Sequence, residues 1–410
     1  MSQNWKPRFF SIWIGQALSL IGSALTQFVL LWWITKTTES ASALAIAGVM
    51  GLLPQAILGP LGGTLADRLN RRHIMIAADS ISAMAMIIMV YLFSSNQIAL
   101  WHIYSLMFLR SSMQAFQSPA AAASTSLLVP PDWLPRVAGM NQAMQGIMTI
   151  AAAPLGALAL AFLPFQGALM IDVVTAVLGI VPLLIYTIPQ TKRLETEKTS
   201  VWTDFKEGLG YVTQRRGLLM LYGLLGLVVL TVMPTFALTP LLVKQHFGGG
   251  VNEVAIMEGL AGIGMIAGGV FISIFPLFKK RIVTLLISFA ISCGTVALTA
   301  LAPSNGLWLA TIWWTLSGIT FSTGNAPMMA IIQTSVPNQI QGRVLSLMNT
   351  VMGLAGPIGL AIAGPLGDAI GVRGVFIVGG TLSAIVCALG FFSSHLMGIE
   401  SPTEKLEPQG

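Results

Sequence analysis

The sequence predicts an all-α polytopic membrane protein, with twelve transmembrane helices in two pseudo-symmetric six-helix bundles. Three observations support this fold class: the scarcity of charge, the number of long apolar stretches and an internal repeat. Only 9% of the 410 residues are charged and 55% are hydrophobic, whereas soluble domains carry about 25% charged residues. Water cannot surround most of such a chain, so a lipid bilayer is its expected solvent.

Twelve apolar stretches account for the predicted helices. A helix needs about 20 residues to cross ~30 Å of hydrocarbon, and each stretch is at least about that long. In lipid a helix is favoured because it satisfies its own backbone hydrogen bonds. The stretches are Phe9–Ile34, Ala41–Leu65, Ile74–Phe93, Leu100–Leu128, Val137–Phe162, Gly167–Ile188, Gly217–Phe247, Val251–Phe278, Ile282–Ala302, Leu307–Ser335, Val344–Ala369 and Gly374–Leu396. The first is longer than the ~7–15-residue apolar core of a secretory signal, so we expect it to remain as the first helix.

An internal repeat indicates that the two halves of the chain are related. Val129-Pro130 followed by Arg136-Val137 recurs as Val336-Pro337 followed by Arg343-Val344. The first copy lies between stretches four and five, and the second lies between stretches ten and eleven. Parallel repeats of this kind place a substrate site between two bundles near the middle of the membrane.

The domain organisation follows from the repeat and from the polar segments. We predict an N-terminal bundle at 1–188, a cytoplasmic linker at 189–216, a C-terminal bundle at 217–398 and a disordered cytoplasmic tail at 399–410. Within the linker, apolar residues at helical spacing predict an amphipathic helix on the membrane surface. These residues are Trp202, Phe205, Leu209 and Val212. A flexible linker without a helix is the alternative.

The distribution of Lys and Arg predicts the orientation of the chain. Apart from Arg110, which lies inside a stretch, the loops on one side hold every Lys and Arg except Lys36, Lys244 and Arg373. Because basic residues are enriched in cytoplasmic loops, we expect both termini in the cytoplasm. The net charge of +6 is explained by this asymmetry and does not indicate binding to nucleic acid.

One short basic segment carries a recognisable motif. Residues 62–75, between the second and third stretches, read Gly-Gly-Thr-Leu-Ala-Asp-Arg-Leu-Asn-Arg-Arg-His-Ile-Met. The segment resembles the signature loop between helices two and three of the major facilitator superfamily. The matching positions are Gly63, Asp67, Arg68, Arg71 and Arg72. Asn70 stands where that family usually has glycine, and both residue types tolerate the left-handed backbone of a tight turn.

Further motifs are similar to the macrolide-efflux group of drug/proton antiporters. They include Trp13-Ile14-Gly15-Gln16, Phe108-Leu109-Arg110-Ser111, Ala115-Phe116-Gln117-Ser118-Pro119-Ala120 and Gly356-Pro357-Ile358-Gly359-Leu360. The resemblance implies proton-coupled export of amphipathic or hydrophobic compounds, such as macrolide-type antibiotics, by alternating access in the inner or plasma membrane of a bacterium. The implied partners are a small-molecule substrate, protons and the lipid bilayer, and we expect a monomer.

Other functions remain open alternatives. The same helices could export a native metabolite, a siderophore or a lipid, and a sensor or scaffold with a transporter fold would move no solute. An enzyme is not predicted, because the four histidines lack ligand spacing and neither a nucleophile–base arrangement nor a phosphate-binding loop occurs. The two cysteines, Cys293 and Cys387, lie inside apolar stretches. We therefore predict no metal, no cofactor and no disulfide framework.

Four ionisable residues stand out inside apolar stretches: Arg110, Asp172, Glu258 and, near the cytoplasmic start of its stretch, Asp79. An ionised group in hydrocarbon costs a few kcal/mol, so such residues are expected to face protein or a water-filled cavity. The resemblance implies a proton-coupling or substrate-responsive role for Arg110, whose permanent charge can hold a carboxylate ionised. Asp172 and Glu258 lie about two turns from the outer helix ends and are the predicted proton carriers. For both acids, satisfaction by helix termini or hydroxyls is the alternative, and for Arg110 the alternative is a fixed structural ion pair.

The basic segment is predicted to act as a gating loop. It comprises Gly63, Asp67, Arg68, Arg71 and Arg72, with Asp79 as a brace. We expect the charges to hold helix ends together and to release them as the halves rock. Gly62 and Gly63 are expected to let two helices approach closely, and the arginines are expected to meet the carbonyls of helix C-termini.

The candidate substrate cavity is assigned to polar residues and to a methionine stripe. The assigned residues are Gln16, Ser19, Ser23, Gln114, Gln117, Met140, Met144, Met148 and Asn325. Thioethers adapt to varied apolar shapes, which suits a broad substrate site. Helix packing or contact with lipid is the alternative role for the methionines.

Overall fold

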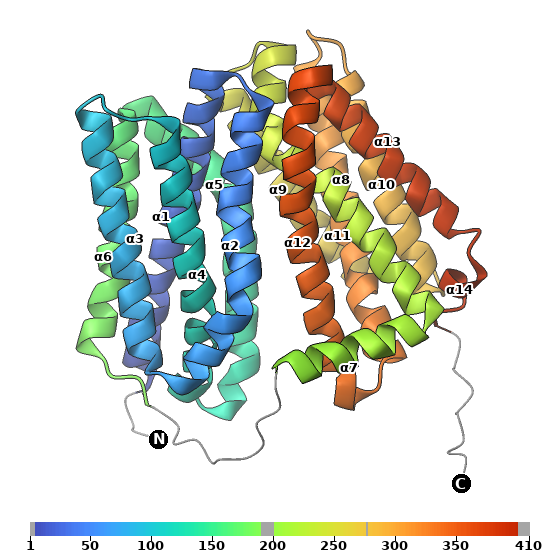
Figure 1. Ribbon diagram of the computed structural model, residues 1–410, viewed down its shortest axis with the longest axis horizontal. Coiled ribbons are helices and arrows are strands. Elements are labelled where there is room, and N and C mark those ends of the chain that lie inside the picture. The colour runs from blue at the N-terminus through green and yellow to red at the C-terminus, as the bar shows by residue number, and fades with distance from the viewer. Residues whose placement is uncertain (1–4, 190–200, 276–277, 401–410) are drawn as a thin grey trace. The chain divides into compact units, whose positions relative to one another are not determined.

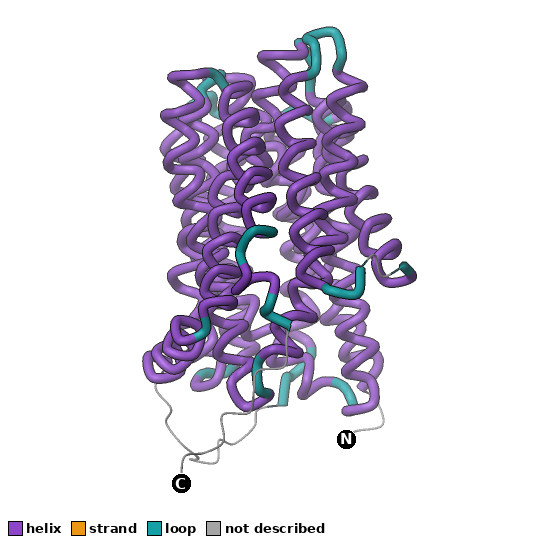
Figure 2. Tube along the Cα trace, turned by 90° about the vertical axis from the view of Figure 1, so that its right-hand side faces the viewer, coloured by secondary structure: helices purple, strands orange, loops and turns teal. Residues whose placement is uncertain are grey.

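The computed structural model describes residues 5–189, 201–275 and 278–400, and within them it consists of helices joined by loops and turns (Figures 1 and 2). Twelve helices of 19 to 34 residues form the described part. They are α1 (Trp5–Thr38), α2 (Ala41–Arg68), α3 (Arg71–Ser94), α4 (Leu100–Leu128), α5 (Leu134–Phe162), α6 (Phe165–Ile185), α8 (Arg216–Phe247), α9 (Val251–Ile274), α10 (Arg281–Leu301), α11 (Leu307–Ser335), α12 (Asn338–Ile370) and α13 (Val372–Gly390). Two shorter α-helices, α7 (Val201–Gln214) and α14 (Ser394–Met397), and a 3-10 turn at Pro131–Trp133 complete them.

Ten helices of the described part are long and apolar enough to cross a membrane. The other two long helices, α4 and α11, have 29 residues each but carry more polar side chains. On α4 these include Arg110, Gln114 and Gln117. Polar side chains on a membrane helix face protein or water, so α4 is expected to border a cavity. The predicted all-α polytopic fold class is confirmed.

The chain divides into two compact units. The first consists of Met1–Glu197 together with Ala237–Leu260 and Leu360–Ala369, and the second holds the remaining residues. Parts of α8, α9 and α12 thus belong to the unit that contains α1 to α6. The bundle bounds at 1–188 and 217–398 remain a prediction. Residues 190–200 of the predicted linker and 401–410 of the predicted tail lie outside the described residues.

The linker helix α7 is joined to the rest of the second unit. Glu207 on α7 forms an ion pair with Arg343 near the start of α12, and a Cβ on Gly208 would come 3.0 Å from the carbonyl oxygen of Arg343. Tyr222 on α8 donates its hydroxyl to the carbonyl oxygen of Val344 at 2.7 Å. Both partners on α12 belong to the repeated Arg-Val motif, which therefore packs against α7 and α8.

Small residues let the helices of the first unit approach closely. In this unit α1 packs against α6, and α2 packs against α4. A Cβ on Gly62 would overlap the carbonyl oxygen of Ala115 on α4, and a Cβ on Gly22 would overlap the Thr175 hydroxyl on α6. Close backbone contact of this kind supplies much of the packing attraction between helices in lipid. Gly63 has open space where a Cβ would be, so only Gly62 of the predicted glycine pair makes such a contact.

Hydroxyl groups join the helices of the second unit. The Ser292 and Ser317 hydroxyls lie 3.0 Å apart between α10 and α11, and Thr323 donates to Ser288 at 3.1 Å between the same helices. Hydrogen bonds of this kind hold membrane helices together where lipid offers no alternative partner.

Candidate functional site

The first unit contains a polar cavity of about 430 Å³ that is lined by all six helices from α1 to α6. Most of its polar lining is uncharged. The uncharged polar residues are Gln16, Ser19, Ser23, Gln27, Gln55, Ser82, Ser111, Gln114, Gln117, Gln145 and Thr149. The charged residues are Asp79, Arg110 and Asp172. The polar side chains of α4 therefore face this cavity, as their cost in lipid requires.

Arg110 and Asp172 form an ion pair inside the cavity. Nη1 of Arg110 lies 2.6 Å from Oδ2 of Asp172, and the side chains are 17% and 8% exposed. The hydroxyl of Ser23 on α1 donates to Oδ1 of the same carboxylate at 3.1 Å. A charge in such a site is tolerated only when it is paired and hydrogen-bonded. The structure thus joins two of the four ionisable residues that the sequence singles out separately.

Asp79 lies in the same cavity and is held by a chain of amides. Gln16 donates Nε2 to Oδ2 of Asp79 at 2.9 Å and to the carbonyl oxygen of Gly179 at 3.2 Å. Gln117 donates to Oε1 of Gln16 at 2.5 Å. Both glutamines are buried, at 9% and 7% exposure. The sequence interpretation made Asp79 a brace for the basic loop, but its hydrogen bond goes to α1 and its side chain faces the cavity.

A more apolar cavity of about 250 Å³ adjoins the polar one. The two share the residues Gln16, Leu20, Gln114, Gln117 and Gln145. The apolar lining of the second cavity includes Phe9, Ile12, Trp13, Met75 and Met144. Together the two cavities offer a charged end and an apolar end to a bound molecule.

The structure brings most of the predicted cavity residues together. Seven of them line one or both cavities: Gln16, Ser19, Ser23, Gln114, Gln117, Met144 and Met148. Met140 instead packs against the apolar cluster around Phe9 and Val137. Asn325 is exposed on α11 in the second unit. Glu258 lies on α9 next to Gly259, where a Cβ would come 3.1 Å from Pro154. Neither Asn325 nor Glu258 lines the two cavities.

Sequence reasoning missed several lining residues. Gln27, Gln55, Ser82 and Ser111 all face the polar cavity. Each is an uncharged polar residue near the middle of an apolar stretch. That signal could have found them, because a polar group in hydrocarbon seeks a partner or water just as a charged group does.

The basic loop caps helix ends within the first unit. Nη1 of Arg71 donates to the carbonyl oxygen of Ala123 on α4 at 2.9 Å, and Nη2 of Arg72 donates to that of Leu184 on α6 at 2.8 Å. The expectation that arginines meet C-terminal carbonyls is confirmed for Arg72 and for Arg71, whose Nε also donates to the carbonyl oxygen of Ala66 near the end of α2 at 3.1 Å. A cation at this position faces the negative end of the helix dipole. Asp67 lies 3.7 Å from Arg71 and is 67% exposed, so this pair contributes little.

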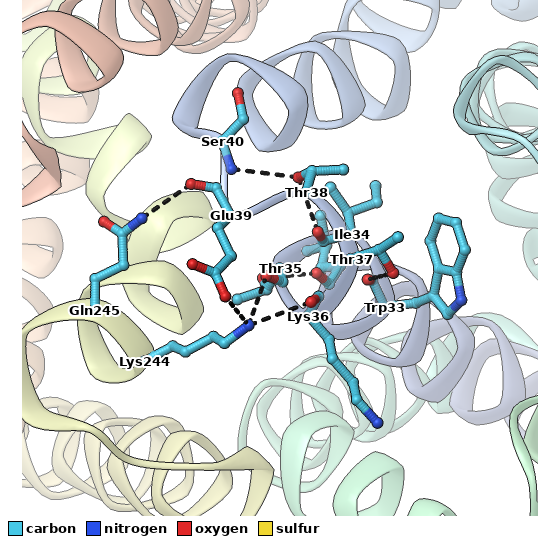
Figure 3. A network of polar contacts seen from close by, with 11 residues as sticks. Trp33, Ile34, Thr35, Lys36, Thr37, Thr38, Glu39, Ser40, Lys244 and Gln245 are labelled. Atoms are coloured by element: carbon cyan, nitrogen blue, oxygen red, sulfur yellow. Dashed lines mark hydrogen bonds and ion pairs between the residues drawn. The ribbon is translucent and has the colours of Figure 1, made fainter.

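A second polar cluster surrounds the turn between α1 and α2 (Figure 3). Nζ of Lys244 on α8 lies 2.7 Å from Oε1 of Glu39 and donates to the carbonyl oxygen of Lys36 at 3.2 Å. Gln245 donates to the carbonyl oxygen of Glu39 at 2.9 Å. The end of α8 therefore places a cation at the C-terminus of α1, where the helix dipole is negative.

Asp368 on α12 completes this cluster from the other side of the turn. Its two carboxylate oxygens accept hydrogen bonds from the backbone of Ala41 at 2.8 Å and of Ser42 at 3.3 Å. The Ser40 hydroxyl lies 3.3 Å from both oxygens. An anion thus caps the N-terminus of α2. We name Glu39, Ser40, Lys244 and Asp368 the turn clasp; all four belong to the first compact unit.

A bundle of membrane helices around a cavity that combines fixed charge, amides and an apolar extension defines a multi-pass membrane transporter. The comparisons with known proteins agree. The family model described as Major Facilitator Superfamily matches residues 12–360 and 236–408, and the chain belongs to that superfamily. It is a transporter and not an enzyme.

Curated relatives include proteins named for efflux. The chain is 33% identical over 390 residues to Macrolide efflux protein A of Streptococcus pyogenes, covering 94% of this chain and 96% of that protein. It is 24% identical over 375 residues to the multidrug efflux pump Tap of Mycolicibacterium fortuitum, covering 87% of this chain and 88% of that one. The similarity thus extends over nearly the whole length of each protein.

Solved structures share the fold at low sequence identity. A variant of the nucleoside transporter NupG superposes with a TM-score of 0.75 at 13% identity, covering 93% of this chain and 98% of that one. A bacterial homolog of the human lysosomal transporter Spinster, in an inward-facing and unoccupied conformation, gives a TM-score of 0.68 at 16% identity over 98% of each chain. These likenesses concern the fold alone.

Proposed function

We propose that the protein exports amphipathic or hydrophobic compounds, macrolide-type antibiotics among them, in exchange for protons. The substrate class is supported by the 33% identity to Macrolide efflux protein A along almost the whole chain. The coupling is supported above all by one observation: Arg110 and Asp172 form an ion pair in a cavity rather than in sealed packing. A pair at a cavity wall can exchange protons and meet a substrate.

The ion pair provides a coupling step. Arg110 keeps its charge at all physiological pH values, so Asp172 is the member of the pair that changes protonation state. A proton on Asp172 removes its attraction for the guanidinium and raises the net charge of the cavity by one. The cavity lining has three charged side chains among the described residues: the pair itself, Arg110 and Asp172, and Asp79. A change of one charge among three is large enough to alter the affinity for a substrate.

The turn clasp is the proposed gate for alternating access. It fixes the turn between α1 and α2 to the ends of α8 and α12. In the proposed cycle these contacts break when the turn separates from the ends of α8 and α12, and they form again when it returns. Fixed charges at helix ends suit this role because each contact is a single hydrogen bond or ion pair and not an extensive packed surface.

Uptake of erythromycin by inverted membrane vesicles tests the proposal. We expect accumulation when the vesicle interior is made acidic and none without the gradient. Asp172→Asn and Arg110→Gln are each expected to abolish gradient-driven accumulation, since each removes one charge of the pair. Asp132→Asn, on the exposed 3-10 turn, is the matched control and should transport normally.

Three outcomes would contradict parts of this proposal. Accumulation that ignores the gradient would refute proton coupling. Normal transport by folded Asp172→Asn would remove the ion pair from the coupling step. A wild-type protein that moves no erythromycin under either condition would refute this substrate class and favour a native metabolite.

A further inference from the structure

The described lining of the polar cavity has one more acidic side chain than basic side chains. Among the described residues that line it, the carboxylates are those of Asp79 and Asp172, and the one cationic side chain is that of Arg110. Arg110 is engaged with Asp172 at 2.6 Å. Asp79 accepts a hydrogen bond from the neutral amide of Gln16 at 2.9 Å. Among the residues that the structure describes, Asp172 therefore has a cationic partner, whereas Asp79 has a neutral one.

The amide chain gives Asp79 a fixed position. Gln16 is 9% exposed, and its Nε2 is shared between Oδ2 of Asp79 and the carbonyl oxygen of Gly179. Gln117 holds the other end of the same amide. Oδ1 of Asp79 receives no side-chain hydrogen bond from the described residues. A carboxylate with one oxygen anchored and the other available is suited to accept a charged hydrogen bond from a ligand.

The surroundings of Asp79 match an amphipathic cation. Gln16, which donates to its carboxylate, and Gln117, which donates to Gln16, also line the adjoining apolar cavity with Trp13, Met75 and Met144. A molecule that places an ammonium group at Asp79 can extend its apolar body into this second cavity. A neutral molecule of the same shape would leave the carboxylate without a counter-charge, which is costly in a partly buried site.

We propose that Asp79 binds the protonated amine of the substrate and so determines specificity for amphipathic cations, while the Arg110–Asp172 pair serves proton exchange. The inference rests on the proposed function, because it assigns the charge of the transported compound. It divides the two acids of the cavity between two tasks according to their partners: Asp172 has a guanidinium, and Asp79 has an amide.

Two compounds of nearly equal size test this division. Erythromycin carries a basic tertiary amine, whereas its N-oxide carries no net charge near neutral pH. In inverted vesicles we expect the wild-type protein to show a lower KM for erythromycin than for the N-oxide. Asp79→Asn should raise the KM for erythromycin by roughly 10- to 100-fold, the range of a charge-assisted hydrogen bond. It should lower the KM for the N-oxide, or at least not raise it, because the neutral compound no longer leaves a carboxylate without a counter-charge.

Matched variants separate charge from structure. Asn at position 79 still offers an oxygen to the Gln16 amide, so the fold is expected to persist. Asp79→Glu keeps the charge and should retain the preference for erythromycin. Asp132→Asn removes an exposed acid instead and should behave as the wild type. Both Asp79 variants should still depend on the pH gradient, because the Arg110–Asp172 pair is intact.

Several results would overturn the inference. Equal wild-type KM values for the two compounds would refute it without any variant. Equal losses for both compounds in Asp79→Asn, or loss of its gradient dependence, would make Asp79 a structural group or a proton carrier instead. Failure of the proposed function is distinguishable from these results, because it would appear as gradient-independent transport in the wild-type protein.

Discussion

Asp368→Asn removes the negative charge that caps the N-terminus of α2, and its effect can be estimated from the contacts of this side chain. The carboxylate accepts hydrogen bonds from the backbone of Ala41 and Ser42. Losing the charge assistance of these bonds and the attraction to the helix dipole costs about 1–3 kcal/mol. A change of this size shifts a two-state equilibrium roughly 5- to 150-fold.

Glu39→Gln is the matched comparison within the same clasp. Glu39 is 59% exposed and its partner Lys244 is 25% exposed, so their ion pair contributes only about 0–1 kcal/mol. Lys244 also keeps its hydrogen bonds to the carbonyl oxygens of Thr35 and Lys36 after the change. We therefore expect Glu39→Gln to shift the same equilibrium less than about 5-fold.

Labelling of a cysteine at position 45 measures the opening. Ala45 is 2% exposed, and a Cβ on Gly364 of α12 would come 2.7 Å from its methyl group. In Ala45→Cys protein, the new thiol should react with a polar thiol reagent only when α2 and α12 separate. The native cysteines, Cys293 and Cys387, are 1% and 0% exposed, so their background reaction should be slow. Nanodiscs leave both ends of the protein accessible to the reagent.

The expected order of labelling rates is Asp368→Asn, then Glu39→Gln, then the protein with an intact clasp. An unchanged rate in Asp368→Asn would show that the clasp does not hold this end closed. A larger effect of Glu39→Gln would show that the exposed ion pair, and not the helix cap, supplies the holding energy. Each variant must first show the thermal transition of the parent protein, so that unfolding is not mistaken for opening.

Three further changes test the packing and charge arguments. Gly62→Ala should lower the free energy of unfolding by about 1–3 kcal/mol, because its Cβ would overlap a carbonyl oxygen of α4. Gly63→Ala should be neutral or slightly stabilising, because the space for its Cβ is open. Equal effects of the two changes would contradict this packing argument. Arg110→Ala should lower the free energy of unfolding by about 3–5 kcal/mol, because the charge of Asp172 is left without a partner. Changing both residues to Ala should cost less than this single change. Additive losses in thermal unfolding would show that the two side chains do not interact energetically. Arg72→Ala removes hydrogen bonds to two carbonyl oxygens of α6, so hydrogen exchange should rise at the C-terminal end of that helix, and unchanged exchange would contradict the capping role.

The prediction of the candidate site from sequence was uneven for a physical reason. Arg110 and Asp172 were found because charge in an apolar stretch is a strong signal. Asp79 follows the basic loop closely in the chain, which predicts a place beside that loop, whereas its hydrogen bond reaches Gln16, 63 residues away. Met140 belongs to the same stripe as Met144, yet it packs against an apolar cluster instead of lining a cavity.

The sequence by itself determined which segments are membrane helices and where the basic loop lies, because burial of a long apolar segment in lipid depends on local composition alone. The tertiary structure alone decided which side chains meet. A nearly uniform apolar helix has no strong preference for rotation about its axis, and that rotation decides which of its few polar residues face a cavity, a neighbouring helix or the lipid. The Arg110–Asp172 pair, the position of Asp79 and the turn clasp all depend on contacts between helices that are far apart in the chain.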